Sequence, residues 1–90
     1  MTRSFSAEAQ RTLDTVRVTP TQLREADCVD GHKCWIAVNG VVYDIAGSSK
    51  WNSGQHYGVT AGTDATEQFV DSGHAAAKLN DLPVVGTLDQ

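Results

Sequence analysis

The sequence predicts a single α+β domain, in which a small mixed sheet and the helices come from separate stretches of the chain. The chain has 90 residues, of which 40% are hydrophobic and 20% charged, as in one small globular domain. Runs rich in β-forming residues occupy 34–38, 41–45 and 84–88, and helix start and stop signals fill the stretch between the last two. This segregation is typical of α+β folds.

The N-terminal residues 1–15 carry only a weak pattern. Residues 7–13 form either a short surface helix after Ser6 or an arm that frays. Residues 16–18 alternate apolar and basic side chains, as a short edge strand does. We therefore divide the chain into an N-terminal arm or short helix, 1–15, and one domain, 16–90.

The next helix has a clear beginning. Thr19 is placed as the N-cap, Pro20 takes the first helical position, and Gln22 stands where a capping box requires it. We expect this helix to end near Ala26.

A hairpin follows. Two β-rich runs, Cys34–Val38 and Val41–Ile45, flank Asn39-Gly40, a dipeptide that favours a two-residue hairpin turn. This hairpin should supply much of the sheet and of the core.

Two helix pairs are predicted before the final strand, and the sequence indicates where three of their helices lie. One helical turn fits within 46–54. A second helix should start at the N-cap Asp64 and end at Gly73, and a third should span 75–82 until Pro83 stops it.

The net charge of −4 is unevenly placed. Residues 1–50 carry six basic and six acidic side chains, whereas residues 51–90 carry only Lys78 against five acids. Nucleic-acid binding, which needs a basic footprint, is therefore disfavoured. The acidic half suits docking to a basic protein, or it is simply a solvated surface that keeps the domain soluble. The five acids are Asp64, Glu67, Asp71, Asp81 and Asp89.

No feature indicates a membrane protein. No apolar run approaches the roughly 20 residues that span a bilayer, and residues 1–6 lack the apolar region of a signal peptide. We expect a soluble monomer without a membrane span.

Cys28 and Cys34 allow three interpretations. Asp30-Gly31 between them is a turn signal that favours a disulfide. Two free thiols, or a zinc site with His32 and a further ligand, are the alternatives. A disulfide would favour the periplasm, and without one we expect a cytoplasmic protein.

His56 and His74 are the candidate iron ligands. Both lie at helix or loop junctions beside small residues, and Gly58 and Gly62 allow close backbone approach to a bulky ligand or simply form turns. Two imidazoles on opposite faces of a haem would fill both axial positions. The residue types also allow a helix-cap and a surface histidine, or a zinc site with Asp64.

Several motifs then resemble the cytochrome b5 family, over roughly residues 16–88. Ala61–Phe69 with Asp71–His74 is similar to its second haem-ligand region, and Cys34–Ile45 to its core hairpin. The closing strand, Val84–Leu88, and the strand-to-helix step, Val18–Leu23, also resemble the family's. As a whole the chain is similar to free-standing soluble bacterial members of the b558 type.

The resemblance implies a non-covalent haem b gripped by two helix pairs, with His56 and His74 as axial ligands. It also implies that Trp35 is a core residue and that Phe69 contacts the haem. The expected cofactor-binding residues are Val38, Ile45, Trp51, Tyr57, Phe69, Leu79 and Leu82.

The first ligand loop departs from the family pattern. His56-Tyr57-Gly58-Val59 stands where the family usually has His-Pro-Gly-Gly, and Ala75 stands where many members have a serine that helps to hold a haem propionate. Some relatives with this fold use tyrosine as a haem ligand, so Tyr57 is an alternative to His56.

These expectations define a soluble b-type cytochrome that carries single electrons to a redox partner with a basic docking face and is not an enzyme. The alternatives are a haem-binding or small-ligand module with an open coordination position, and a structural or zinc-binding domain without haem.

Overall fold

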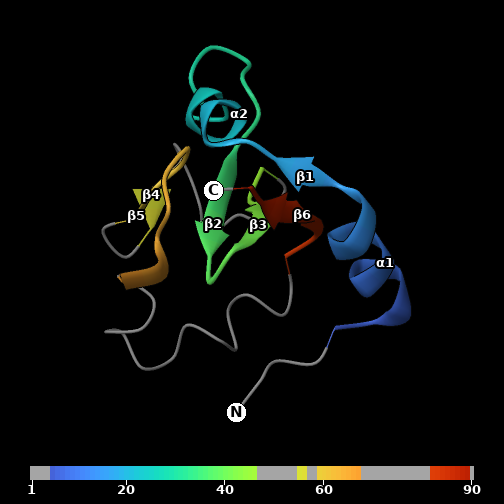
Figure 1. The fold of residues 1–90 in the computed structure, drawn as a ribbon. Helices are drawn as coiled ribbons and strands as arrows, with labels where there is room; N and C mark the ends of the chain where they lie inside the picture. Colours follow the sequence, from blue (N-terminus) through green and yellow to red (C-terminus); the bar gives the residue numbers. More distant parts are fainter. Residues whose placement is uncertain (1–4, 47–54, 57–58, 68–81, 90) are drawn as a thin grey trace.

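A four-stranded mixed sheet forms the centre of the computed structural model, which describes residues 5–46, 55–56, 59–67 and 82–89 (Figure 1). The strand order is β1-β6-β3-β2. β1 is parallel to β6, and β3 is antiparallel to both β6 and β2. The first and last strands of the chain are therefore neighbours, which confirms the α+β class. The strands are β1 (Arg17–Val18), β2 (Trp35–Val38), β3 (Val41–Asp44) and β6 (Val84–Leu88).

The predicted hairpin joins β2 to β3. Val38 pairs with Val41, and the turn residues Asn39 and Gly40 have φ values of 51° and 80°. Positive φ at both positions is the geometry that Asn-Gly favours in a two-residue hairpin turn. The main-chain N–H of Leu88 donates to the Gly40 carbonyl (2.8 Å), so the turn is also tied to the last strand.

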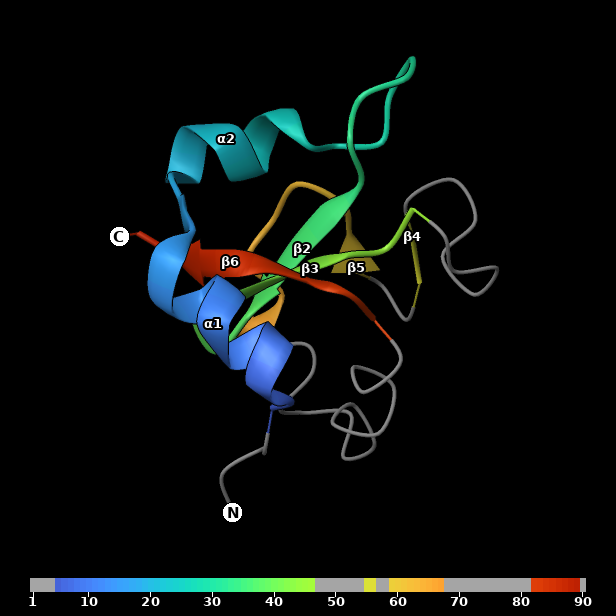
Figure 2. The ribbon, with the colours of Figure 1, turned by 90° about the vertical axis from the view of Figure 1, so that its right-hand side faces the viewer.

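The N-terminal residues form helix α1 (Ala7–Thr15), which is the helical alternative of the two predicted. The Ser6 side chain caps it by accepting from the Ala9 N–H at 3.1 Å. α1 lies along β6 (Figure 2), where Leu13 is buried and the Thr87 hydroxyl donates to the Leu13 carbonyl at 2.8 Å.

Helix α2 (Pro20–Glu25) starts as predicted and ends one residue earlier. The Thr19 hydroxyl accepts from the Gln22 N–H (3.1 Å), and the Gln22 side chain accepts from the Thr19 N–H (2.8 Å). Two N–H groups at the helix start are thus satisfied reciprocally, as in a capping box.

A second, two-stranded sheet lies where the sequence predicted a loop around His56. β4 (Gln55–His56) and β5 (Val59–Thr60) pair antiparallel, with His56 opposite Val59. The β-branched residues of β5 favour extended backbone. The glycines around them favour turns, so the sequence predicted a loop.

Side chains on the two faces of the main sheet form two separate clusters. Alternation along β2 sends Ile36 and Val38 to one face and Trp35 and Ala37 to the other. Trp35 is only partly buried, at the border of its cluster. The cluster that contains Ile36 and Val38 is called the wall cluster, and its members are Cys34, Ile36, Val38, Tyr43, Ile45, Ala61, Ala65 and Leu82. The second, which includes Leu23 of α2, is the α2 cluster: Val18, Leu23, Ala37, Val42 and Leu88.

The predicted helix pairs fall largely outside the described residues. The chain is helical at Thr66 and Glu67, where the helix after Asp64 was expected. In the parts of the chain that the structure describes, no helix is long and apolar enough to cross a membrane.

Candidate functional site

The segment 61–65 is hydrogen-bonded along the outer edge of β2. The Gly62 N–H donates to the Trp35 carbonyl (2.6 Å). The Ala37 N–H donates to the Thr63 carbonyl (3.1 Å), and the Ala37 carbonyl accepts from the Ala65 N–H (2.7 Å). The segment therefore covers an edge that would otherwise expose unpaired backbone groups.

Gly62 packs closely against Arg24 of α2 and against Asp27, which follows the helix. Its φ is 84°, and a Cβ there would lie 3.1 Å from the Arg24 carbonyl oxygen and 3.2 Å from the Asp27 Cα. Glycine is required here for close packing against the protein's own backbone.

Asp64 caps the helical turn that follows, as the sequence predicted. Its carboxylate accepts from the Thr66 N–H at 3.1 Å and from the Thr66 hydroxyl. The same hydroxyl accepts from the Asn39 N–H at 2.9 Å. The start of the helix that leads in sequence toward Phe69 and His74 is thereby fastened to the hairpin turn.

Three of the expected cofactor-binding residues lie together in the wall cluster. Val38, Ile45 and Leu82 are 4%, 1% and 7% exposed. The Asp44 N–H donates to the Pro83 carbonyl (3.0 Å), which brings the chain beside Leu82 onto β3. Their contact with a cofactor stays a prediction.

The same cluster contains residues that the sequence analysis did not name. Ile36 and Tyr43 lie two positions before Val38 and Ile45 in the chain, so period-two alternation is the signal that could have identified them. Ala61 and Ala65 carried no such signal, because their burial depends on the pairing of 61–65 with β2.

His56 is placed only through its backbone. It lies in β4, whose partner β5 runs directly into the 61–65 segment. The other expected site residues, Trp51, Tyr57, Phe69, His74 and Leu79, lie outside the described residues.

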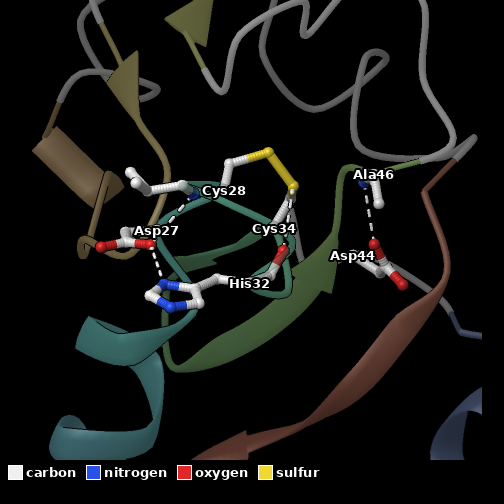
Figure 3. Close-up of a disulfide and its surroundings, with 7 residues drawn as sticks. Asp27, Cys28, His32, Cys34, Asp44 and Ala46 are labelled. Atoms are coloured by element: carbon white, nitrogen blue, oxygen red, sulfur yellow. Dashed lines mark hydrogen bonds and ion pairs between the residues drawn. A yellow bond between two sulfur atoms is a disulfide. The ribbon is translucent and has the colours of Figure 1, made fainter.

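Cys28 and Cys34 form a disulfide, with their Cα atoms 4.4 Å apart (Figure 3). The disulfide prediction is confirmed over free thiols. The zinc alternative is wrong, because the two sulfurs are bonded to each other and neither offers a thiolate to a metal ion. Within the described ranges no three histidine, cysteine or acidic side chains are grouped to hold a metal ion.

Asp27 organises the disulfide loop. Its Oδ1 accepts from the Val29 N–H (3.1 Å) and lies against His32 Nδ1. The hydrogen bond from His32, followed by that from Val29, holds the pKa of the Asp27 carboxyl below its ordinary value.

A cavity of about 450 Å³ lies between α2 and the disulfide loop. Trp35, His32 and Lys33 line it, and the Lys33 ammonium lies 5.0 Å from the centre of the Trp35 indole. None of the expected site residues that the structure describes lines this cavity, and Trp35 belongs to the sheet face opposite the wall cluster.

The family model described as "Cytochrome b5-like Heme/Steroid binding domain" matches residues 19–89. The chain belongs to this family. The match runs from the cap of α2 to the residue after β6, so it includes three of the four strands of the main sheet (β2, β3 and β6), the 61–65 segment and both predicted ligands of the cytochrome b5-like domain.

Two solved structures from archaea resemble the domain closely. A cytochrome b5 domain protein of Methanococcoides burtonii is 38% identical, with a TM-score of 0.75, over 83% of this chain and 99% of its own. A cytochrome b5 domain protein of Hadesarchaea YNP_N21 is 36% identical, with a TM-score of 0.73, over 83% of this chain and 100% of its own. No curated protein matches the chain.

The described residues fit a haem on the wall-cluster side of the sheet. That side is lined by aliphatic and aromatic side chains, and among the described residues no polar or charged side chain is buried. An apolar surface of this kind suits a porphyrin ring, and imidazoles at 56 and 74 are suitable iron ligands.

Proposed function

We propose that this cytochrome b5-like domain carries single electrons through a non-covalent b-type haem with His56 and His74 as axial ligands. The observation that carries the proposal is the position of residues 59–67. This stretch connects β4, which contains His56, to the helix start that precedes His74, and it is hydrogen-bonded to the edge of the strand that presents the apolar wall.

The chemistry follows from the donor set. When bound, the haem supplies an iron that changes charge by one electron. Two imidazole ligands leave no open position for a substrate or oxygen, so we expect electron transfer and no turnover of a substrate. The apolar wall, which includes Val38 and Ile45, would exclude water and raise the reduction potential by disfavouring the extra charge of ferric iron.

The disulfide supports non-covalent binding. The chain has two cysteines, and both are joined to each other, so neither offers a thiol for covalent attachment of a haem. The same bond favours an oxidising compartment such as the periplasm.

The first test is an absorption spectrum of the purified protein, oxidised and then reduced, with single variants beside it. We expect a sharp low-spin Soret band and split reduced bands, both lost in His56→Ala and in His74→Ala. His32→Ala is the matched control, because His32 is bound to Asp27 on the disulfide loop, and its spectrum should equal that of the unchanged protein.

A high-spin spectrum, or one insensitive to His56→Ala, would contradict bis-histidine ligation. Loss of the Soret band in Tyr57→Phe alone would assign the first ligand to Tyr57 and favour a module with an open coordination position.

A further inference from the structure

The Cys28–Cys34 disulfide is part of the apolar wall on which the proposed haem site depends. Cys34 is 8% exposed and belongs to the wall cluster, and Cys28 packs against the same cluster. This cluster contains Val38 and Ile45, two of the expected haem-contacting residues. The disulfide therefore joins the loop between the cysteines to the wall itself.

Main-chain hydrogen bonds connect this end of β2 to both parts of the pocket. The Cys34 carbonyl accepts from the N–H of the wall residue Ile45 at 2.8 Å. The next carbonyl, of Trp35, accepts from the Gly62 N–H at 2.6 Å. A backbone shift at 34–35 would consequently move the wall and the segment that leads to the second ligand.

The other end of the disulfide loop reaches the same segment. Asp27, which precedes Cys28, packs so closely on Gly62 that a Cβ on the glycine would lie 3.2 Å from the Asp27 Cα. Both ends of the loop are thus in contact with the 61–65 segment or with its hydrogen-bond partners.

The loop is held in an unfavourable backbone conformation. Cys28 has φ 68° and Asp30 has φ 47°, in the left-handed region that costs free energy for residues with a side chain. The Cys28 N–H donates to the Lys33 carbonyl (2.9 Å), so the conformation at Cys28 shapes the whole loop. Opening the disulfide would allow this backbone to relax away from its present position.

We propose that the thiol–disulfide state of Cys28 and Cys34 sets how tightly the domain retains its haem. The disulfide form retains the haem, and the dithiol form releases it faster. This inference rests on the proposed function, since it concerns the same pocket.

A dithiol donor opens the bond in two balanced steps. One donor thiolate attacks Sγ of Cys28, which is more exposed than the buried Cys34, and forms a mixed disulfide. Cys34 leaves as a thiolate and takes up a proton. The second donor thiolate then attacks the donor's own sulfur in the mixed disulfide, so the donor becomes a disulfide and Cys28 leaves and is protonated. Two electrons and two protons pass from the donor to the chain.

The test measures haem loss from the ferric holoprotein to excess apomyoglobin. One sample keeps the disulfide, and the other is treated with dithiothreitol, desalted without oxygen, and checked by thiol alkylation and intact mass. We expect haem loss at least about 5-fold faster from the dithiol form, in the range of ordinary coupling between sites. The double variant Cys28→Ser, Cys34→Ala should lose haem as the dithiol form does.

Leu13→Ala separates coupling from general loss of stability. Leu13 is the buried residue of α1, which packs on β6, and it belongs to neither cluster, so its truncation should lower the melting temperature and leave haem loss unchanged. A second readout needs no haem: in the apoprotein, the amide NMR signals of Ile45 and Gly62 should shift on reduction.

Equal rates of haem loss from the disulfide and dithiol forms would overturn the inference, as would acceleration by Leu13→Ala equal to that by reduction. If the untreated protein gives a low-spin spectrum and both forms lose haem at the same rate, this inference is overturned but the proposed function is not. A protein that binds no haem in its disulfide form would overturn the proposed function, and this inference with it.

Discussion

Asp27 shows how one carboxylate fixes a loop through two donors of different kinds. His32 donates through its side chain and Val29 through its backbone, and both bonds are made to the ionised carboxylate. Because the pKa of Asp27 in the folded protein lies below that in the unfolded chain, its contribution to stability is present above the ordinary value, about 3.9. It is lost as the pH falls through the lowered pKa of the folded protein.

We expect His32→Ala to raise the pKa of Asp27 toward its ordinary value, because the variant removes the largest cause of the shift. The acid limb of unfolding should move to higher pH accordingly. An NMR titration of the Asp27 carboxyl carbon would measure this. Lys33→Ala changes the loop charge without touching the hydrogen bond and should leave the pKa where it is; an equal rise in both variants would refute the assignment to His32.

At single positions, sequence reasoning succeeded where the signal was local. The Asn39-Gly40 turn and the Asp64 cap depend on a few consecutive residues, and both are confirmed by φ values or hydrogen bonds. For the cysteine pair, the turn signal between the two residues favours a disulfide over two alternatives that the sequence leaves open, and the structure confirms the disulfide. The orientation of His32 toward Asp27 could not be foreseen, since it depends on how the loop folds back on itself.

Among the elements, the 61–65 segment is the one that connects β5 to the sheet and to the helix start at Thr66. Its register on β2 is set by three backbone hydrogen bonds and by the close approach of Gly62 to α2. No local pattern in the sequence predicts this pairing, because paired residues such as Trp35 and Gly62 are about 27 positions apart in the chain. The strands β4 and β5 were missed for a related reason: each is two residues long, too short for alternation to be recognised.

Gly62→Ala should displace this segment. The left-handed φ of 84° costs about 1–3 kcal/mol for a residue with a side chain, and the added Cβ would also press on backbone atoms of Arg24 and Asp27. We expect the free energy of unfolding in urea to fall by more than the backbone cost alone, and the low-spin spectrum to weaken.

Gly31→Ala is the matched control for this prediction. Gly31 has nearly the same φ, 85°, and a Cβ there would have no atom within 4 Å. The difference between the two variants therefore isolates the packing of Gly62 on α2. Equal losses of stability would show that the contact with Arg24 and Asp27 contributes nothing.

For the molecule as a whole, the N-terminal helix belongs to the folded unit although the family match begins at residue 19. α1 packs on β6, and the residue after it, Val16, approaches β6 so closely that a Cβ on Gly86 would lie 2.7 Å from the Val16 carbonyl oxygen. The Val16 carbonyl also accepts from the Thr87 N–H at 3.0 Å. The N-terminal residues therefore support the sheet from the edge where β1 lies, whereas 61–65 is bonded to the β2 edge.

The uneven charge leads to a prediction about the redox partner. Asp64 and Glu67 are exposed at the start of the helix that precedes His74, and Asp71 follows in the same acidic half. Complementary charge speeds encounter by about 10-fold or more at low salt, and added salt screens the effect. We expect the rate of encounter with a basic partner to depend on these three acids more than on the net charge of −4 of the whole chain.

The triple variant Asp64→Asn, Glu67→Gln, Asp71→Asn tests this directly. Asparagine at 64 keeps an oxygen that can cap Thr66, so the helix start is preserved while the charge is removed. With a basic c-type cytochrome as electron acceptor, the stopped-flow rate of electron transfer at low salt should fall by about 10-fold, and its dependence on ionic strength should weaken.

The control variant neutralises Glu8, Asp14 and Glu25 on α1 and α2, which changes the net charge equally. It should alter the rate of electron transfer much less. Equal slopes in the two triple variants would mean that only net charge guides the encounter, and a slope unchanged by the first would remove the acidic half from partner docking altogether.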